Sequence, residues 1–334
     1  MVQYLQQPLN WVNGTVFALS GVVFLFIILG FVTYAIYFQR KLLGWMQLRI
    51  GPNRVGPLGL LQTVADVLKL LIKEDIIPAK ADKPLFILAP VIAFVPSFAV
   101  LATLPFSETL GFADLGVGLL YYIAVSGITT IGVLAGGWAS HNKWAILGAL
   151  RAVAQMISYE IPLVMSVIGV VLLTGSLNLR DIVEAQSGGI WNWFFLVQIL
   201  GFLIFVVAAV AELNRTPFDL PEAESELIAG YNVEYSGFRF AFFMLAEYVY
   251  LFGMSAIATL VFLGGWNPPF EFLAFIPGII WFILKFSFAV FFIFWLQATL
   301  PRVRADQLMT FGWKVLIPLS LLNIFITALI KTIV

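Results

Sequence analysis

Residues 14–38 read GTVFALSGVVFLFIILGFVTYAIYF, a run of 25 residues without a charged side chain. Backbone N–H and C=O groups in hydrocarbon must bond to one another, so a bilayer is crossed by a helix of roughly 20 apolar residues. This stretch is long and apolar enough to cross, and the polar residues Gln39, Arg40 and Lys41 end it. The stretch therefore predicts a transmembrane helix.

The same kind of run recurs along the whole chain. Eight runs qualify, at residues 14–38, 85–106, 117–138, 152–175, 191–211, 240–263, 277–300 and 311–330. Apolar residues make up 61% of the 334 positions and charged residues 11%, whereas soluble domains carry roughly 25% charged residues. We therefore expect an all-α polytopic membrane protein with eight transmembrane helices, folded as one membrane domain over residues 1–334.

The orientation follows from the loops between these runs. Lys and Arg gather in loops one, three, five and seven: Arg40, Lys41, Arg49, Arg54, Lys69, Lys73, Lys80, Lys83, Lys143, Arg151, Arg215, Arg239, Arg302 and Arg304. The opposite side holds Arg180 and Lys331. Because basic loops stay in the cytoplasm, we expect both termini outside and the odd-numbered loops inside. The neutral first residues predict no cleaved leader.

Loop one, residues 40–84, is too long to be a simple connector. Its centre, Gly51-Pro52-Asn53-Arg54-Val55-Gly56-Pro57, is rich in turn-forming residues and predicts a rigid non-helical turn. Apolar side chains then recur at helical spacing at Leu60, Leu61, Val64, Val67, Leu68 and Leu71. This pattern predicts an amphipathic helix along the membrane surface. The loop serves either as a positive-inside anchor alone or also as a docking platform and pocket wall.

Loop five, residues 212–239, has the opposite charge. It carries two bases and six acids: Glu212, Asp219, Glu222, Glu224, Glu226 and Glu234. An acidic loop is often only a solvated surface, but apolar residues such as Phe218 and Leu220 are interleaved here and predict partial burial. Crowded, partly buried carboxylates repel one another and hold protons near neutral pH. The loop therefore predicts a group that accepts and releases protons.

Three ionisable residues fall well inside predicted spans, Glu160, Glu247 and Lys285, while Lys314 lies just inside the edge of the last span. Facing lipid would cost each about 2.5–3.5 kcal/mol, so they should face the bundle interior, where such groups mark ion or proton routes. The alternative is a structural ion pair between Glu247 and Lys285. Pro162 predicts a local opening of the helix beside Glu160. Counted by position, both acids lie about two to three turns from the cytoplasmic ends of their spans.

Several kinds of site are excluded within this chain. There is no Cys, which excludes disulfides and cysteine-ligated iron–sulfur clusters, and the single His141 makes a multi-histidine metal or haem site untenable. We expect no metal site, no covalently bound cofactor and no nucleic-acid partner.

The two long loops resemble one family: the H subunit of proton-pumping NADH–quinone oxidoreductase, respiratory complex I. The resemblance lies in residues 47–57, QLRIGPNRVGP, and residues 214–227, NRTPFDLPEAESEL, and extends to Ser158-Tyr159-Glu160, GGW at 264–266 and PRVRADQ at 301–307. The family usually carries Glu before the Arg that ends the first span, whereas this chain has Gln39. A carboxylate at that position is therefore not essential here.

The resemblance implies a membrane-arm subunit of an NADH:quinone oxidoreductase, a proton translocase, with no redox centre and no catalytic residue of its own. Its partners would be the hydrophilic-arm subunits that carry the terminal iron–sulfur cluster, other membrane-arm subunits and the lipid bilayer, and its substrate would be quinone. The quinone-cavity platform would comprise Arg49, Gly51, Pro52, Asn53, Arg54, Gly56, Pro57, Asp66, Lys69, Arg215 and Phe218. The proton path would comprise Asp219, Glu222, Glu224, Glu226, Glu234, Glu160 and Glu247.

Other functions stay open at this point. The nearest alternative is the homologous membrane subunit of an energy-converting hydrogenase or of a dehydrogenase that uses ferredoxin or another donor. A self-standing secondary transporter is disfavoured, because no paired interrupted helices or inverted repeat is evident. A purely structural anchor leaves the buried acids without a role. A bacterial plasma membrane is the expected location, in preference to an organelle inner membrane.

Overall fold

The structure is a computed structural model that describes residues 11–221 and 228–333. Within these residues it is built of helices without strands, and seven segments are long and apolar enough to cross a membrane. They are α2 (Trp11–Met46), α4 (Lys83–Ala99) with η2 (Val100–Thr103), α5 (Gly118–Ser126) with α6 (Ile128–Ala139), α7 (Lys143–Thr174), α12 (Gly237–Val261), α13 (Gly278–Thr299), and α14 (Ala305–Phe311) with η6 (Gly312–Leu316) and α15 (Ile317–Ile333). The all-helical membrane fold is thus confirmed.

The predicted fifth span differs from the others. Residues 191–211 do not form one helix; they divide into the end of η3 (Ile190–Asn192), the short α9 (Phe194–Val197) and α10 (Ile199–Glu212), with Gln198 at the break. The prediction of a continuous fifth helix is therefore wrong. Gln198 leaves helical geometry at φ −121° and ψ 58°, and its Nε2 donates to Thr327 Oγ1 of α15 over 2.9 Å.

The fourth span is longer than predicted. Helix α7 begins at Lys143 rather than at residue 152, because the Asn142 side chain accepts a hydrogen bond from Trp144 N (2.9 Å) and caps its first turn. Glu160 is therefore the eighteenth residue of a 32-residue helix. Glu160 therefore lies between four and five turns from the start of its helix, and Glu247, the eleventh residue of α12, lies about three turns from the start of its own. Their distances from the cytoplasmic ends of the membrane spans stay a prediction.

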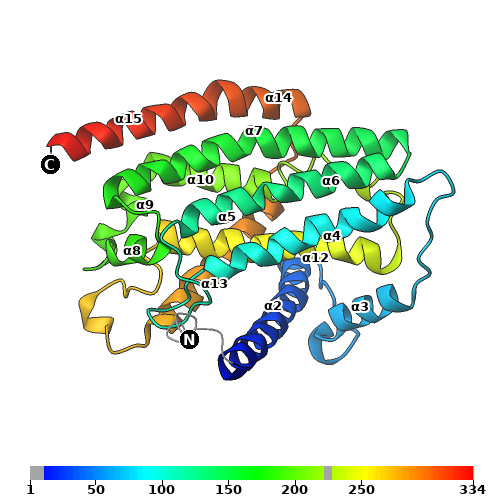
Figure 1. Cartoon of the computed structure of the whole chain (residues 1–334), viewed down its shortest axis with the longest axis horizontal. Coiled ribbons are helices and arrows are strands. Elements are labelled where there is room, and N and C mark those ends of the chain that lie inside the picture. The colour runs from blue at the N-terminus through cyan, green and yellow to red at the C-terminus, as the bar shows by residue number, and fades with distance from the viewer. Residues whose placement is uncertain (1–10, 222–227, 334) are drawn as a thin grey trace.

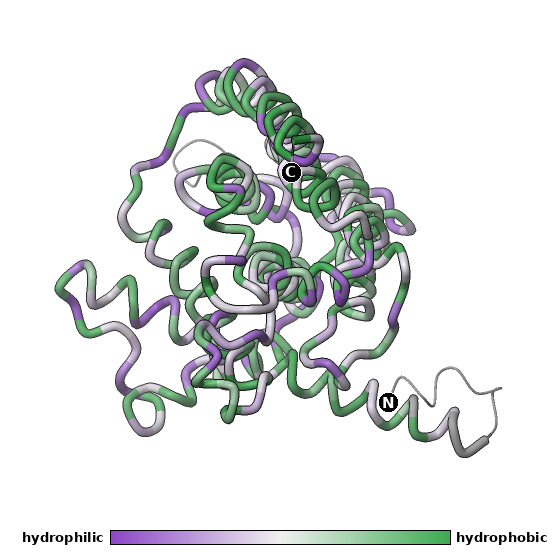
Figure 2. The backbone as a smooth tube through the Cα atoms, turned by 90° about the vertical axis from the view of Figure 1, so that its left-hand side faces the viewer, coloured by the Kyte–Doolittle hydropathy of each residue, from purple (hydrophilic) through white to green (hydrophobic). Residues whose placement is uncertain are grey.

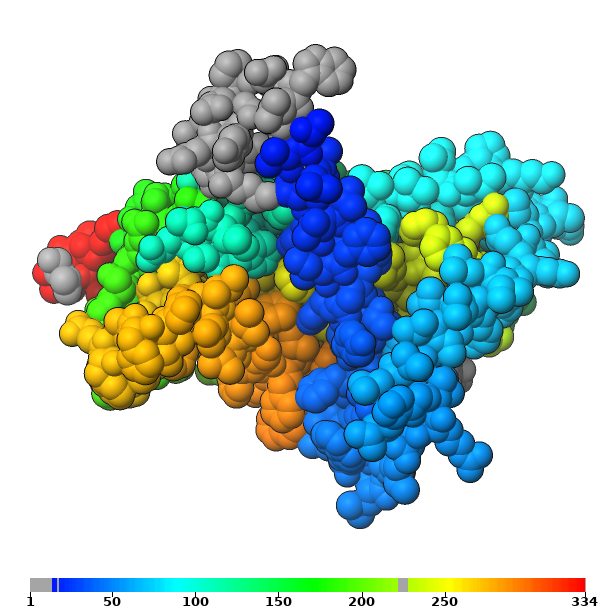
Figure 3. Space-filling model, turned by 90° about the horizontal axis from the view of Figure 1, so that it is seen from below, coloured from blue at the N-terminus to red at the C-terminus, as the bar shows by residue number. Residues whose placement is uncertain are grey.

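The long helices run side by side along the long axis of the molecule (Figure 1). Helix α7 packs between α6, α10 and α15, and α4 packs between α6 and α12. Helix α2 stands at a steep angle to the others and crosses over α12 and α13 (Figure 3). Hydrophobic residues predominate along the helices, and polar segments gather in the connections (Figure 2). Many large apolar side chains are exposed, as expected of a surface solvated by lipid.

Small residues allow the closest helix contacts. A Cβ added to Gly132 of α6 would lie 2.5 Å from Ala93 N in α4, and one added to Gly137 would lie 2.3 Å from Ala149 Cβ in α7. Between membrane helices such small residues permit backbones to approach, because association there depends on packing rather than on escape from water. These contacts fix α6 between α4 and α7.

The remaining helices are short and lie in the connections. They are α3 (Gln62–Ile72), α8 (Leu179–Glu184) and the single turns η1 (Pro57–Gly59), η4 (Gly230–Asn232) and η5 (Glu271–Leu273). Helix α3 lies where loop one was predicted to form a helix, but it begins at Gln62, after the predicted positions Leu60 and Leu61. Its place along the membrane surface stays a prediction. The centre of that loop is non-helical as predicted, except that Pro57 begins the turn η1.

Candidate functional site

Contacts from α2 hold the turn of loop one and helix α3 in place. Gly59 has φ +83°, and a Cβ there would lie 2.4 Å from the carbonyl oxygen of Pro52, so only glycine permits this turn. Tyr37 donates its hydroxyl to Leu58 O over 2.9 Å. Arg40 Nη1 lies 2.6 Å from Asp66 Oδ2 in α3. These contacts join the end of the first helix to the turn and to α3.

The predicted platform residues of loop one lie on the surface. Arg49, Asn53, Arg54, Gly56, Pro57 and Lys69 are exposed, and Gly51, Pro52 and Asp66 are partly exposed. The apolar side chains of the loop are also exposed, among them Leu60, Leu61, Val64, Leu68 and Leu71. This part of the molecule therefore presents a polar turn and an apolar helix face for further contacts.

The buried side chain of Gln155 in α7 forms hydrogen bonds with the start of loop five. Its Nε2 lies 2.7 Å from Ala211 O, 2.8 Å from Phe218 O and 3.0 Å from Asn214 Oδ1, so its amide bridges the end of α10 and the following turn. Gln155 is buried. It is a site residue that the sequence does not reveal, because nothing local distinguishes it from other helical polar residues.

Loop seven holds the same turn from the other side. Val303 N donates to Pro217 O over 3.0 Å, and Arg302 Nη2 lies 3.0 Å from Asp219 Oδ2. The Thr216–Pro217 peptide is cis. Phe218, a predicted platform residue, is buried here and contacts the ring of Tyr159, 5.7 Å between centroids. Asp219 is thus tied to a basic residue at the protein surface.

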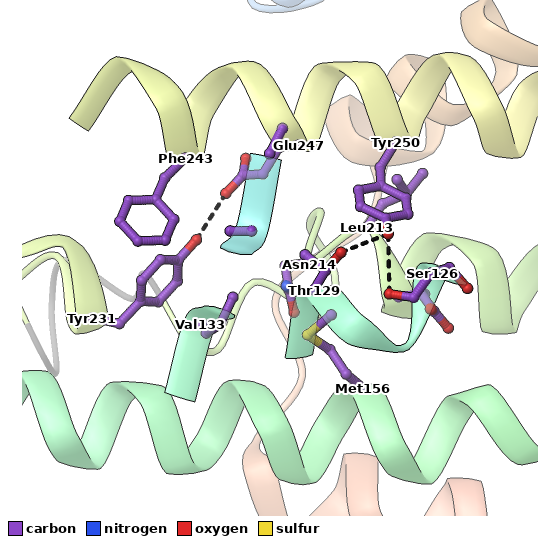
Figure 4. A pocket seen from close by; sticks show the side chains of 13 residues that line it. Ser126, Thr129, Val133, Met156, Leu213, Asn214, Tyr231, Phe243, Glu247 and Tyr250 are labelled. Atoms are coloured by element: carbon purple, nitrogen blue, oxygen red, sulfur yellow. Dashed lines mark hydrogen bonds between the residues drawn. The ribbon is translucent and has the colours of Figure 1, made fainter. Parts of the chain in front are cut away.

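An ion pair between buried Arg215 and partly buried Glu247 joins loop five to α12. Arg215 Nη2 lies 3.6 Å from Glu247 Oε2. Tyr231 donates its hydroxyl to Glu247 Oε1 over 3.2 Å (Figure 4). The Arg215 guanidinium also lies over the ring of Tyr248, 4.5 Å from its centroid. These predicted site residues, Arg215 and Glu247, are therefore brought together.

Lys285 has different partners, so the alternative of a Glu247–Lys285 ion pair is wrong. Its Nζ donates to Asn267 O over 2.7 Å and to Gly265 O over 3.0 Å, both in the connection between α12 and α13. It also lies 3.8 Å from the centroid of the Trp193 ring. The ammonium group is satisfied by carbonyl dipoles and an aromatic face rather than by a carboxylate.

A small cavity lies between α6, α7, α10 and α12. Its volume of about 30 Å³ is enough for one or two water molecules. Its lining includes Ser126, Thr129, Glu212, Glu247 and Tyr250. Figure 4 shows Thr129, Ser126 and Tyr250 joined by hydrogen bonds: Thr129 Oγ1 to Tyr250 OH at 2.6 Å, and Tyr250 OH to Ser126 O at 3.0 Å.

Glu212 is the acid that the site prediction omitted. It is the last residue of α10 and is buried, and its Oε2 has no hydrogen-bond partner among the described residues. A local signal existed: Glu212 directly follows an uninterrupted apolar run, which makes it the loop-five acid nearest the membrane interior. A carboxyl in this position can take up or release a proton into the cavity.

Glu160 approaches the same region from α7 and is partly buried. Helix α7 continues through Pro162, so the predicted opening beside Glu160 is not present. The interruption lies instead at Gly127, between α5 and α6. An ideal Cβ at Gly127 would be 3.0 Å from Glu160 Oε1, which places the Glu160 carboxyl against that turn.

The other predicted acids divide into two groups. Glu234 lies at the edge of loop three, where Asn142 Nδ2 donates to its Oε1 over 2.7 Å. Glu222, Glu224 and Glu226 lie outside the described residues. Within the residues that are described, no group of three or more His, Asp or Glu side chains is arranged to hold a metal ion.

Gln39 occupies a buried position where α2, α12 and α13 meet. Its Nε2 donates to Gln297 Oε1 over 2.8 Å, and Tyr248 donates its hydroxyl to Gln39 Oε1. Tyr248 in turn lies under Arg215, so Gln39 is linked to the Arg215–Glu247 ion pair. An amide suits this position because it donates to one neighbour and accepts from another.

Comparison with known proteins extends over almost the entire chain. The family model for NADH dehydrogenase matches residues 19–328. The chain is 68% identical over 332 residues to the H subunit of NADH-quinone oxidoreductase from Anoxybacillus flavithermus, covering 99% of this chain and 98% of the relative. It is 66% identical over 326 residues to the corresponding protein of Brevibacillus brevis, covering 98% and 96%. With that of Bacillus thuringiensis it shares 67% over 328 residues, covering 98% and 97%.

Proposed function

Because the chain belongs to the NADH dehydrogenase family, as the H subunit of an NADH:quinone oxidoreductase, we propose that it forms the start of the carboxylate path that couples quinone reduction to proton translocation. One observation carries this proposal: the carboxyls of Glu212 and Glu247 line a single cavity at the base of loop five, and Glu160 reaches the adjacent turn. The three acids come from α7, α10 and α12, and among the described residues only Glu247 forms an ion pair with a base. Charge pairing therefore does not account for Glu160 and Glu212.

The cavity supplies what a proton path needs. It has room for about one or two waters, and Tyr250 and Thr129 add hydroxyl groups that both donate and accept hydrogen bonds. Like charges in a confined space disfavour simultaneous ionisation, so a proton arriving at one carboxyl changes the affinity of the next. Protons would reach this cavity from the cytoplasmic side through the other acids of loop five, which are Asp219, Glu222, Glu224, Glu226 and Glu234.

Loop one and the start of loop five would form the wall of the quinone cavity. The exposed polar residues of the turn would meet the hydrophilic-arm subunits, and the apolar face of α3 would rest on the bilayer. On this proposal the iron–sulfur clusters reside in partner subunits, while this chain binds quinone and conducts protons. Seven long helices, with α9 and α10 together as an eighth crossing, would span a bacterial plasma membrane.

Replacement of Glu160 or Glu212 by Gln tests the carboxylate path in the complete complex. We expect assembly to persist, because Gln keeps the shape, and both quinone reduction and proton pumping to fall. NADH:quinone reductase activity, dye-reported acidification of inverted vesicles and native gels measure these three quantities. Glu224→Gln should behave likewise. Glu271→Gln, on the exposed turn η5, is the matched control and should change none of them. Full pumping by assembled Glu160→Gln and Glu212→Gln complexes would refute the path.

The electron donor needs its own measurement, since related complexes use hydrogen or ferredoxin. Co-purified partners identified by mass spectrometry, with quinone reduction assayed on NADH and on ferredoxin, distinguish these cases. We expect NADH-dependent quinone reduction and iron–sulfur partner subunits. Hydrogenase partners without quinone reduction would contradict the quinone assignment.

A further inference from the structure

Gly127 occupies the turn that separates α5 from α6. Its backbone angles, φ −58° and ψ −24°, are ordinary helical values that any residue adopts. Conformational freedom therefore does not account for a glycine here. The space around it does, because a Cβ would lie 3.0 Å from Glu160 Oε1 and 3.8 Å from Ala124 O. The closest atom that a side chain would meet is a carboxyl oxygen of the proposed proton path.

Adding that Cβ would displace the Glu160 side chain rather than the helix backbone. A separation of 3.0 Å is tighter than ordinary van der Waals contact, and the neighbour must give way by a few tenths of an ångström. Here the neighbour is the free end of a flexible Glu side chain, which moves more easily than a helix backbone. Because Gly127 has ordinary helical φ and ψ, alanine there also reduces the conformational entropy of the unfolded chain, which stabilises the folded state. The substitution would shift the carboxyl without destabilising the chain.

We propose that Gly127 is a positioning residue for Glu160. Because Gly127 has no side chain, the Glu160 carboxyl can lie against the α5–α6 turn, and we call the space that it occupies there the seat. Ser126, directly before Gly127, and Thr129, two residues after it, line the cavity that is also lined by Glu212 and Glu247. Proton transfer requires donor and acceptor to come within hydrogen-bond reach, directly or through one water. A displacement of the carboxyl by a few tenths of an ångström lengthens such contacts and slows the transfer. The inference rests on the proposed role of Glu160.

Gly127→Ala in the complete complex tests the seat. We expect normal assembly and thermal stability, with a severalfold decrease in quinone reduction and in protons pumped. Gly30→Ala in α2 is the matched control, because a Cβ at Gly30 meets nothing within 4 Å, and it should change neither quantity. Wild-type rates in Gly127→Ala would overturn the inference. If Glu160→Gln is impaired and Gly127→Ala is not, only the seat fails; if Glu160→Gln is also harmless, the proposed path itself fails.

A compensating change separates positioning from general packing. Glu160→Asp shortens the side chain by one methylene and withdraws the carboxyl from the added methyl. The double variant Gly127→Ala/Glu160→Asp should therefore lose less activity than the two single losses combined predict. Simple additivity would overturn the inference.

If Glu160→Asp is itself inactive, infrared difference spectra of the purified complex replace the activity test. The carboxyl band that disappears in Glu160→Gln should shift in Gly127→Ala and stay in place in Gly30→Ala. An unshifted band in Gly127→Ala would refute the seat.

Discussion

At the scale of single residues, the site is held by groups that link loops to membrane helices. Arg215, from loop five, pairs with Glu247 in the membrane helix α12 and stacks on Tyr248, and Tyr248 in turn donates to Gln39. The cation thus joins the loop to two further helices. Its position explains why a partly buried acid is tolerated at Glu247, since an unpaired charge there would be costly.

Removing one partner of this ion pair should lower the amount of assembled complex more than it lowers the activity of the complex that does assemble. Arg215→Met leaves the Glu247 carboxylate without its cation, and breaking a buried ion pair costs on the order of 3–5 kcal/mol. We expect less assembled complex on native gels and a lower melting temperature. The double variant Arg215→Met/Glu247→Gln removes both charges and should recover part of the stability while pumping stays low. Equal losses in the single and double variants would contradict this account.

At the scale of elements, α3 has a polar face tied to α2 and an apolar face open to the surroundings. Leu68, 53% exposed, lies on the apolar face. If that face rests on the bilayer, Leu68→Glu forfeits the burial of one leucine, about 1.5–3 kcal/mol, and adds a charge. We expect faster amide hydrogen exchange over residues 62–72 in the intact complex and slower quinone reduction. Lys73→Gln, at the exposed position directly after α3, is the control. Equal exchange in both variants would argue against membrane contact.

The helices also show which structural features hydropathy predicts and which it does not. The positions of the long helices follow from apolar length, because lipid forces backbone groups to pair within each helix. Two features, the break at Gln198 and the start of α7, cannot be predicted from apolar length. The break at Gln198 is stabilised by Thr327, far away in sequence, so the local run looks continuous. The start of α7 is set by the Asn142 cap, and the helix extends beyond the apolar run that marks membrane depth.

At the scale of the whole molecule, long-range contacts decide what the acids do. The sequence singled out Glu160 and Glu247 because a charge is conspicuous in an apolar run. It could not show that Gly127 faces Glu160, that Arg215 rather than Lys285 pairs with Glu247, or that Glu212 and Glu247 line one cavity. Each of these depends on helices that are distant in the chain. Local composition therefore identifies candidate acids, and the packing of the bundle assigns their neighbours.

The whole-molecule topology is open to direct test, because the chain has no native cysteine. Single cysteines at Ser187, before α9, and at Ile228, beyond α10, bracket the interrupted helix, and both positions are exposed. The segment 194–212 has 19 residues, about 28 Å as helix, which is nearly the thickness of the hydrocarbon core. If it crosses despite the break, an impermeant maleimide should label Ser187→Cys only from outside the cell and Ile228→Cys only in inverted vesicles. A permeant maleimide, labelling both, establishes that each thiol is accessible. Labelling of both positions from one side would mean that the chain crosses seven times and that its termini lie on opposite sides.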